Sequence, residues 1–456
     1  MADLAERLAE VPAQLAAGIA AHHVPGASLA VLADEQVWAA AAGLLNARTG
    51  VEATPDSVFQ MGSITKVWTT TLVMQLVDEG RLQLADRVAD LLPGFTLRDP
   101  AAARRITVEQ LLTHTSGIDG DRFLDLGRGA DAVARFVEAC RTFELVHPPA
   151  TMWSYCNAGF VLAGRIVELL RGASFDEVLR ERLVRPLGLA ATGTLPEQAI
   201  LHRAAAGHLV DLATGATAVT PVWSLQPSNA PAGATPFTTA TELLAFAALH
   251  LDGGSAGGQP LLSSRAVADM QRRRATLPPG SLADAWGLGW MLHDWEGGLA
   301  IGHGGVTIGQ RAYLVAVPHA RVAIALLTNG GDGDSLFSAL AGPLLRALAG
   351  VTPRELPPAR DDVAVDPARY AGVYERSGAR VAVEPAPGGG LQARVRALWA
   401  SLDPNAPPLA LRPVAPELFR IALPASRRDT GAAFLDPAGT GRPSYLLLAG
   451  RAHPRL

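Results

Sequence analysis

Lysine is almost missing from this chain: Lys66 is the only one among 456 residues, so 38 of the 39 basic side chains are arginines. Cysteine is nearly as rare, and Cys140 and Cys156 are too few for a disulfide framework. No apolar run approaches the ~18 residues of a membrane-spanning helix. Neither sign of charge dominates, since 39 basic and 43 acidic residues leave a net charge of −4. That balance provides no basic field to attract nucleic acid or an anionic membrane.

The N-terminus lacks the features of an export signal. Residues 1–7 carry acidic side chains and no apolar core segment, unlike a signal peptide, so we expect a cytoplasmic location. The chain has no H-E-x-x-H motif, no paired C-x-x-C and no Walker A loop, and most of its histidines are scattered. We therefore expect neither a metal site nor a cofactor. With 49% hydrophobic and 18% charged residues, the composition is that of a soluble globular protein.

The apolar pattern predicts a sheet built from both ends of a long N-terminal region. Residues 27–33 and 37–43 flank a polar turn and predict a hairpin. A helical pattern begins at Ser63 and stops before Gly80. Further helices are expected over 157–171 and 174–184, and strands over 286–295, 309–317 and 321–328. A mainly helical portion would thus be inserted between the parts of the sheet.

The composition changes near residue 351. Residues 351–361 are rich in proline and polar side chains, which predicts a linker. Beyond it, short apolar segments separated by Gly, Pro and Asp predict a small β-domain. These segments are 370–375, 380–384, 391–396, 409–412, 418–423 and 444–448. We therefore divide the chain into a domain at 1–350, the linker, and a second domain at 362–456.

Ser63 and Lys66 form an S-x-x-K pair at the start of the predicted helix. Residues three apart share one face of a helix, and a helix N-terminus favours developing negative charge. A serine hydroxyl becomes a nucleophile when a neighbouring base takes its proton, and a desolvated, neutral lysine is such a base. An ordinary helix cap followed by a solvated lysine is the alternative. Because arginine cannot lose its proton in a protein, the single lysine in this position favours the catalytic interpretation.

Two further elements follow in the chain. Tyr155-Cys156-Asn157 precedes a predicted helix and supplies a phenol and an amide. Taken alone, Tyr155 would be a core aromatic and Asn157 a helix cap. His303-Gly304-Gly305 follows an apolar segment, and its glycines allow a ligand to approach the backbone closely, although a lone histidine is usually structural. The order is S-x-x-K, Y-x-N, H-x-G.

This ordered set resembles the penicillin-binding-protein and class C β-lactamase superfamily of serine acyl-transfer enzymes. The resemblance covers about residues 10–345 and includes four further stretches, 111–117, 232–234, 239–244 and 287–290. It implies an α/β (α+β) serine β-lactamase-like fold, with an antiparallel sheet and an inserted helical subdomain. It also implies that residues 362–456 form an all-β, lipocalin-like domain. His114, in the first stretch, would belong to a structural loop.

The same resemblance implies the roles of five side chains. Ser63 would be the acylated nucleophile, and Lys66 with Tyr155 would form the proton relay. Asn157 would hold Lys66 and the substrate amide. His303 stands where the third motif usually has lysine, a departure that the esterase, D-peptidase and peptide-cyclase branches tolerate. We further expect Tyr155 to need a nearby cation, either Lys66 or a protonated His303.

The resemblance also implies contacts made by the backbone and near the C-terminus. The N–H groups of Ser63 and Val306 would form the oxyanion hole. Gly304 and Gly305 would contact the substrate, and Arg451 is a candidate for steering it, although most arginines are solvated.

Four branches of the superfamily are compatible with these residues. An exported carboxypeptidase or β-lactamase would need a signal, whereas a cytosolic carboxylesterase or a D-specific peptidase would not. The absence of a signal, the H-x-G motif, the run 305–310 and the extra β-domain resemble best the penicillin-binding-protein-type thioesterases. Those enzymes release and macrocyclise a nonribosomal peptide, presented as a thioester on a peptidyl carrier protein. A degenerate, non-enzymatic member would be expected to have lost Ser63 or Lys66.

Overall fold

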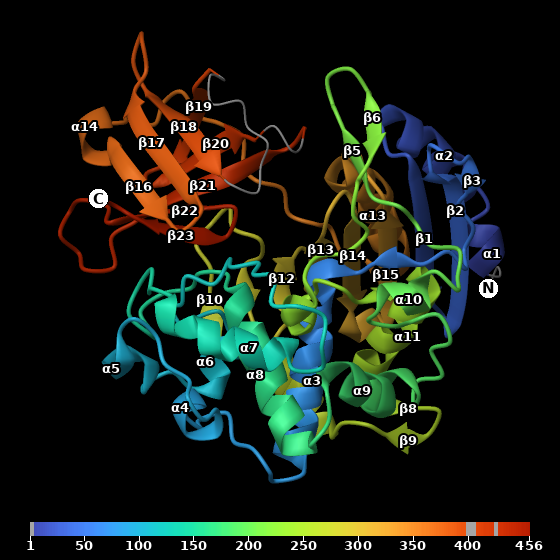
Figure 1. Cartoon of the computed structure of the whole chain (residues 1–456). Helices are drawn as coiled ribbons and strands as arrows, with labels where there is room; N and C mark the ends of the chain where they lie inside the picture. Colours follow the sequence, from blue (N-terminus) through green and yellow to red (C-terminus); the bar gives the residue numbers. More distant parts are fainter. Residues whose placement is uncertain (1–3, 398–406, 424–426) are drawn as a thin grey trace.

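The computed structural model describes residues 4–397, 407–423 and 427–456, which form two antiparallel sheets and a group of helices (Figure 1). The larger sheet has nine strands in the order β10-β11-β12-β13-β14-β15-β1-β2-β3. Strand β1 (Gly26–Ala33) pairs with β15 (Val322–Thr328), with Ala27 opposite Thr328. The sheet is thus assembled from both ends of the N-terminal region, with the helices inserted between them, as predicted.

The other strands of this sheet lie on either side of that central pair. They are β2 (Gln36–Asn46), β3 (Val51–Glu52), β10 (Ala275–Thr276), β11 (Ala285–Trp286), β12 (Met291–Trp295), β13 (Gly298–Val306) and β14 (Arg311–Val317). The predicted hairpin is confirmed as β1–β2. Its turn residues Asp34 and Glu35 both have positive φ, 50° and 63°, which matches the twist of a two-residue hairpin turn.

Two predictions in this sheet need correction. Residues 286–295 are not one strand, because the chain turns at Gly289 (φ 74°) and separates β11 from β12. Strand β13 was not predicted at all. It contains Gly298, Gly302, Gly304 and Gly305, and glycine is depleted in strands.

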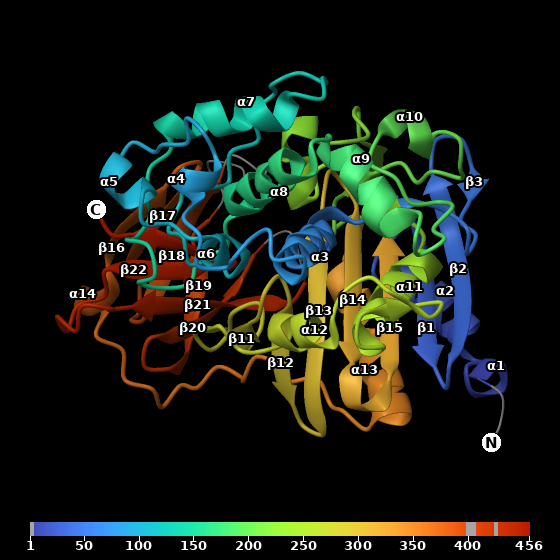
Figure 2. The same ribbon diagram turned by 90° about the horizontal axis from the view of Figure 1, so that it is seen from below.

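Helices cover both faces of the larger sheet (Figure 2). Because side chains alternate along a strand, Leu29 and Val31 of β1 pack with α2 (Val11–Ala21) and α13 (Gly333–Ala349), whereas Ala30 and Leu32 face the core around α3 (Thr65–Asp78). On the side of α3 the sheet also packs against α11 (Ala240–Leu251). The larger domain therefore has two main hydrophobic cores, one on each face of this sheet.

Helix α3 begins after a short 3₁₀ turn, Gly62–Ile64, and Gly80 (φ 69°) follows its end. Helix α8 (Asn157–Arg171) has the predicted bounds. The segment predicted at 174–184 is α9 (Phe175–Leu179), continued by a π-helical turn at Arg180–Val184. The remaining helices are α1 (Leu4–Arg7), α4 (Val88–Leu91), α5 (Pro100–Ala103), α6 (Val108–Leu112), α7 (Ala132–Ala139), α10 (Pro196–Ala199), α12 (Ser264–Met270) and α14 (Pro367–Tyr370). Among the described residues, no helix has the length and apolar character needed to cross a bilayer.

Three short strand pairs connect the helical portion to the sheet and to its own loops. They are β4 (Phe59–Gln60) with β7 (Phe237–Thr238), β5 (His208–Val210) with β6 (Thr217–Val219), and β8 (Ser255–Ala256) with β9 (Gln259–Pro260). The β4–β7 pair lies directly before Ser63, so it fixes the approach of the chain to the α3 turn.

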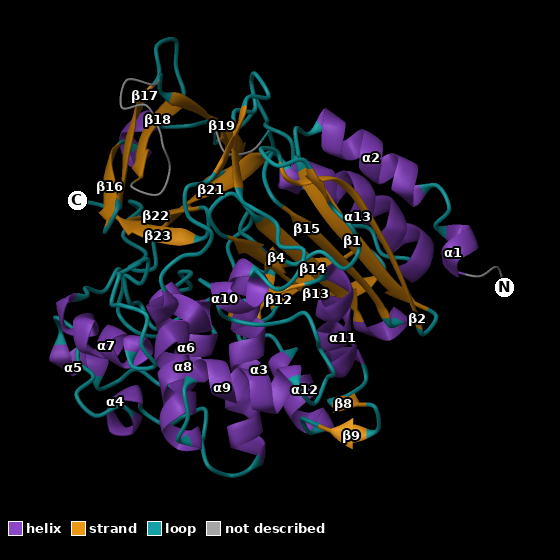
Figure 3. Cartoon of the chain, turned by 45° about the vertical axis from the view of Figure 1, so that its right-hand side comes forward, coloured by secondary structure: helices purple, strands orange, loops and turns teal. Residues whose placement is uncertain are grey.

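The second sheet is a nearly closed barrel of eight strands in sequential order (Figure 3). The strands are β16 (Gly372–Arg376), β17 (Ala379–Pro385), β18 (Leu391–Ala397), β19 (Leu409–Ala415), β20 (Leu418–Ala422), β21 (Asp429–Leu435), β22 (Tyr445–Leu448) and β23 (Arg451–Pro454). A bridge between Tyr374 and Arg455 brings the last strand beside the first. Closure removes the open sheet edges. The form is compatible with the lipocalin-like domain that we expected.

Strands β21 and β23 were missed by the sequence prediction. The first contains a run of small residues, Gly431, Ala432 and Ala433, and the second is the short segment RAHP. The second lacks the branched or aromatic residues that favour a strand, and in the first Thr430 and Phe434 are separated by three small residues, so pairing with neighbouring strands defines both.

The barrel packs directly on the larger domain through one apolar interface cluster. On one side it contains Trp153, Tyr155, Leu277, Trp286 and Met291, and on the other Val414, Leu418, Ala433, Leu447 and Ala452. Two backbone contacts reinforce it, because Tyr155 N–H donates to the Gly450 carbonyl (2.9 Å) and Ala452 N–H donates to Ser154 Oγ (3.1 Å). The barrel is thus built onto the segment that precedes α8.

Candidate active site

Ser63 lies in the 3₁₀ turn that leads into α3, where three glycines surround its backbone. A Cβ atom on Gly233 would lie 2.1 Å from the Gly62 carbonyl oxygen, and one on Gly305 would lie 2.0 Å from the Met61 carbonyl oxygen and 3.1 Å from Ser63 N. Gly62 itself has φ +52°, and a Cβ there would lie 2.7 Å from Val306 N. Only glycine allows these three chain segments to meet. The turn that carries Ser63 is therefore packed closely against the end of β13.

These contacts bring the two predicted oxyanion-hole groups, Ser63 N–H and Val306 N–H, into the same small region. They also explain why residue 305 of β13 is a glycine, since a side chain there would displace the serine turn. Gly304 is different, because a Cβ there would meet only the Ala312 carbonyl oxygen at 3.9 Å. Whether Gly304 and Gly305 contact a substrate stays a prediction.

Lys66 lies one helical turn after Ser63 and is completely buried. Its Nζ is 3.0 Å from Ser63 Oγ and donates a hydrogen bond of 2.6 Å to the Ala232 carbonyl. Burial lowers the pKa of Lys66 well below its usual value, and the nearby charge of Arg451 lowers it further, against a smaller opposing effect of Asp121. A neutral amine within hydrogen-bonding distance of a serine hydroxyl can accept its proton.

Tyr155 is buried beside this pair. Lys66 Nζ lies 5.0 Å from the centre of its ring, and the phenol hydrogen-bonds with Ser63. Burial raises the pKa of Tyr155, while the Arg451 charge and the bond with Ser63 lower it. The ring of His114 stacks on it at 4.1 Å between centroids. Tyr155 thus contacts both members of the S-x-x-K pair.

His303 on β13 lies near the same cluster, and its environment corrects one expectation. Burial, together with the Lys66 charge, lowers the pKa of His303 to about 3. A neutral His303 cannot be the cation beside Tyr155. Its Nδ1 lies 2.6 Å from the Gly304 carbonyl, which can only accept, so this nitrogen carries the proton. The cations near Tyr155 are instead Lys66, when protonated, and Arg451, whose guanidinium carbon lies 4.5 Å from the ring centre.

Asn157 is the first residue of α8, and its partner differs from the predicted one. Its side-chain amide donates to Asp121 Oδ1 at 2.6 Å. In the described part of the chain it makes no hydrogen bond with Lys66, whose Nζ is satisfied by Ser63 and Ala232. Asn157 therefore reaches the relay through Asp121 in this structure, and its contact with a substrate amide stays a prediction.

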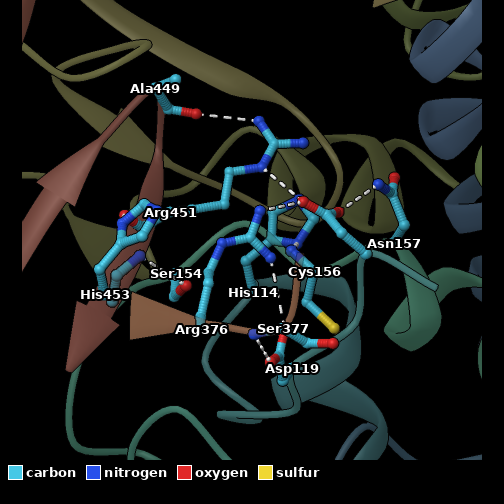
Figure 4. Close-up of polar contacts among 12 residues, drawn as sticks. His114, Asp119, Ser154, Cys156, Asn157, Arg376, Ser377, Ala449, Arg451 and His453 are labelled. Carbon is cyan, nitrogen blue, oxygen red and sulfur yellow. Dashed lines mark hydrogen bonds and ion pairs between the residues drawn. The ribbon is translucent and has the colours of Figure 1, made fainter. Parts of the chain in front are cut away.

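The barrel completes this region with two arginines (Figure 4). Arg451, at the start of β23, contacts Asp121 through Nε at 3.1 Å, and Arg376, at the end of β16, contacts Asp121 Oδ2 at 2.6 Å and Asp119 Oδ1 at 3.3 Å. Ser377 N–H donates to Asp119 Oδ2 at 2.7 Å. These contacts, called here the barrel clasp, join the turns of the barrel to the 119–121 loop of the larger domain.

Charge pairing sets the protonation states in the barrel clasp. Burial alone would raise the pKa of Asp121, but Arg451 and Arg376 outweigh it and bring the value to about 2. Asp119 shows the opposite balance, since burial raises its pKa despite the Ser377 and Arg376 contacts. Asp121 is therefore an anion that links Asn157 to two cations of the barrel.

The structure brings together Ser63, Lys66, Tyr155, His303 and Arg451, of which Arg451 is almost 400 residues from Ser63 in sequence. Sequence reasoning missed Asp119, Asp121 and Arg376. The only local signal was the acidic pair D-G-D at 119–121, one residue after the LLTHTSG stretch at 111–117. Their partners lie more than 250 residues away, beyond the reach of motif spacing.

Comparisons with known proteins point in one direction. A sequence model of the β-lactamase family matches residues 8–349. Penicillin-binding protein 4 of Amycolatopsis lactamdurans is 48% identical over 361 residues, covering 78% of this chain and 94% of that protein. The crystal structure of SurE aligns over 100% of both chains with a TM-score of 0.82 and 30% identity. A D-stereospecific amidohydrolase from a Streptomyces species aligns over 73% of this chain and 97% of its own, with a TM-score of 0.58 and 28% identity.

Proposed function

Because this chain belongs to the β-lactamase family, we propose that its Ser63 site performs acyl transfer, releasing a nonribosomal peptide from a carrier-protein thioester and closing it into a ring. The family is one of serine hydrolases, and the relatives include a penicillin-binding protein and a D-stereospecific amidohydrolase. The cyclising activity is the proposed step beyond that shared chemistry.

One observation carries the proposal: the barrel supplies Arg451 to the Ser63 site. Its guanidinium lies 4.5 Å from the Tyr155 ring centre and ion-pairs with Asp121. A hydrolase of small esters has no need of a second domain at its nucleophile. The similarity to SurE covers 100% of this chain and therefore includes the barrel. A SurE structure with D-Leu (30% identity, TM-score 0.79) favours a substrate that carries a D-residue.

The chemistry follows from the protonation states. Neutral Lys66 takes the Ser63 proton as Oγ attacks the thioester carbonyl, and the Ser63 and Val306 N–H groups would stabilise the oxyanion. Collapse of the tetrahedral intermediate then expels the carrier thiolate, which takes the proton from protonated Lys66. An ester remains on Ser63. The N-terminal amine of the peptide then attacks this ester, an amide forms, and Ser63 recovers its proton. Tyr155, between Ser63 and Lys66, would pass protons in both steps.

The amine must compete with water at about 55 M, which requires that it be held close, as effective molarities of ~10⁵ M or more allow. The barrel contacts the larger domain on two sides. Beyond the barrel clasp, Arg427 N–H donates to Asp332 at 3.1 Å, and its guanidinium donates to the Leu212 carbonyl at 2.8 Å. A barrel held by the barrel clasp and by Arg427 would restrict water at Ser63 and fold the peptide back. In this proposal Arg451 also steers the substrate.

The test uses a linear peptide with a D-residue at its acyl end, supplied as an N-acetylcysteamine thioester. We expect the wild type to give mainly cyclic product by mass spectrometry and one acyl adduct on Ser63, and Ser63→Ala to give neither. Exclusive hydrolysis of such thioesters, with rapid turnover of short-chain esters, would replace the cyclase proposal with an esterase. Exclusive hydrolysis of D-peptides would replace it with a D-specific peptidase; the Streptomyces neighbour is named a D-stereospecific amidohydrolase.

A further inference from the structure

Gln310 is a buried polar residue in the turn between β13 and β14, only 1% exposed. Its side-chain oxygen accepts a hydrogen bond of 2.9 Å from Gln60 N–H, and its side-chain nitrogen donates one of 3.1 Å to the Ala205 carbonyl. Both functional ends of the amide are thus used. The two bonds connect the β13–β14 turn with segments 250 and 105 residues earlier in the chain.

The position of Gln310 relates it to both halves of the predicted oxyanion hole. Gln60 lies three residues before Ser63, in strand β4. On the other side, the Gln310 carbonyl accepts a hydrogen bond of 3.0 Å from Thr307 N–H, which closes the turn directly after Val306. The side chain of Gln310 therefore binds the segment that leads to Ser63 N–H. Its backbone carbonyl closes the turn that follows Val306 N–H.

The surrounding contacts hold this arrangement in place. The Ala205 carbonyl also accepts a hydrogen bond of 2.9 Å from the Trp223 indole N–H, and the Gln60 side-chain amide donates to the Trp223 carbonyl. Gln60 and Gln310 are both buried, so losing one partner would leave unsatisfied polar groups away from water, at a cost in stability or position. The segments have little room to adjust, since the Gly62 and Gly305 positions are already in close backbone contact.

We propose that Gln310 is a positioning residue for the oxyanion hole, holding the segment that leads to Ser63 at a fixed distance from the turn that follows the Val306 N–H. The inference rests on the proposed function, because it presumes that these two N–H groups stabilise the oxyanion of acyl transfer. The inference goes beyond the proposed function because it assigns the geometry of the oxyanion hole to a residue that touches neither the substrate nor the nucleophile.

The expected effect follows from the sensitivity of such sites. Removing one oxyanion-hole donor costs about 10²–10³-fold in kcat, and a misplacement of about 1 Å can cost 10²-fold. We expect Gln310→Leu, which keeps the bulk and removes both bonds, to slow acylation of Ser63 by about 10–100-fold. The Ki of a boronic acid that mimics the tetrahedral intermediate should rise by a similar factor. Binding of the intact thioester should change less than threefold.

The probes are the N-acetylcysteamine thioester of N-acetyl-D-leucine and the boronic acid of the same D-residue. Acylation is followed by intact-mass spectrometry in rapid quench, and ground-state binding by calorimetry in a Ser63→Ala background. Gln75→Leu is the matched control, because Gln75 is also a buried glutamine whose amide donates to two carbonyls, of Arg182 and Leu261, far along α3. It should leave acylation within threefold of the wild type.

Gln310→Glu keeps the proposal testable even where Gln310→Leu does not fold. A protonated carboxyl has one acceptor and one donor, the pattern of the glutamine amide, and burial raises a carboxyl pKa. Its acylation rate, expressed relative to the wild type at each pH, should therefore recover as the pH falls. A ratio that is flat with pH, or a folded Gln310→Leu that acylates within threefold of the wild type, would overturn the inference. Absence of any Ser63 acylation in the wild type would instead overturn the proposed function.

Discussion

At the scale of single residues, the decisive feature is a primary amine kept out of water. Burial and Arg451 lower the pKa of Lys66 in the folded protein, whereas in the unfolded chain it is charged up to about pH 10.5. Folding at a pH between these two pKa values therefore releases a proton. Stability must rise with pH between the folded and unfolded pKa values, by about 1.4 kcal/mol for each pH unit.

Lys66→Met tests this linkage directly. The variant lacks the titrating group, so its free energy of unfolding should exceed that of the wild type most at the lowest pH of this window. The difference should shrink by about 1.4 kcal/mol per unit as the pH rises toward 10.5. Urea denaturation at pH 7, 8 and 9 measures it. Parallel curves for the two proteins would mean that Lys66 is charged when folded.

Tyr155 contributes a hydroxyl to the site and a ring to the interface cluster, and the two can be separated. Tyr155→Phe keeps the ring that packs on His114 and loses only the contact with Ser63. Catalysis by a positioned acid–base group is typically worth ~10²–10⁴-fold, so kcat/KM should fall in that range with an unchanged melting temperature. A loss of less than tenfold in kcat/KM would mean that Tyr155 contributes only to packing.

At the scale of elements, the sequence predicted the features that depend on residues close together in the chain. The S-x-x-K pair and α8 were found because helix spacing and end signals are encoded within a few residues. Strand β13 was missed because four of its nine residues are glycine, which is depleted in strands, and one of them, Gly305, is required by the close contact with the serine turn. The barrel clasp was missed for another reason: Asp121 and Arg376 become meaningful only once the barrel is docked. The roles that the resemblance assigned to Asn157 and Arg451 stay predictions, although both residues lie at the site.

The β22–β23 turn is the element through which the barrel acts on the relay, and Arg451 is its charged group. Because that charge lowers the pKa of Lys66, Arg451→Gln should raise it and move the acid limb of the kcat/KM profile to higher pH. Arg451→Lys, which keeps a cation, should move it less. Arg455→Gln is a control one residue beyond the same strand, since its guanidinium binds the Arg369 carbonyl at 3.0 Å within the barrel. An unshifted limb in Arg451→Gln would exclude electrostatic tuning by the barrel.

At the scale of the whole molecule, the barrel clasp is an ion network with little exposure to water. The side chains of Arg376 and Asp121 are only 3% and 6% exposed. Removing one partner of such a network leaves an uncompensated buried charge and costs about 3–5 kcal/mol. Arg376→Met should therefore destabilise the protein by that amount, whereas the double variant Asp119→Asn, Arg376→Met, which keeps the Asp121–Arg451 ion pair, should be destabilised less. Chemical denaturation measures both.

If the single and double variants are equally destabilised, charge pairing does not explain the barrel clasp and packing does. The result also bears on domain deletion. Removing residues 362–456 would uncover Trp153, Trp286 and Met291 of the interface cluster and leave Asp119 and Asp121 without their arginines. Single substitutions in the barrel turns therefore test catalysis with less effect on folding than deletion of residues 362–456.

The order of strands in the larger sheet has a consequence for how the chain folds. Strand β1 is flanked by β2, which follows after a two-residue turn, and by β15, which lies about 300 residues further on. Closing a loop of that length costs about 3 kcal/mol more entropy than closing one of ten residues, and non-local pairing of this kind slows folding. The β1–β2 hairpin can form early, but the other edge of β1 stays unpaired until β15 folds against it. During that time the edge can pair with other strands or other chains. We expect refolding to be slow and its yield to fall steeply with protein concentration.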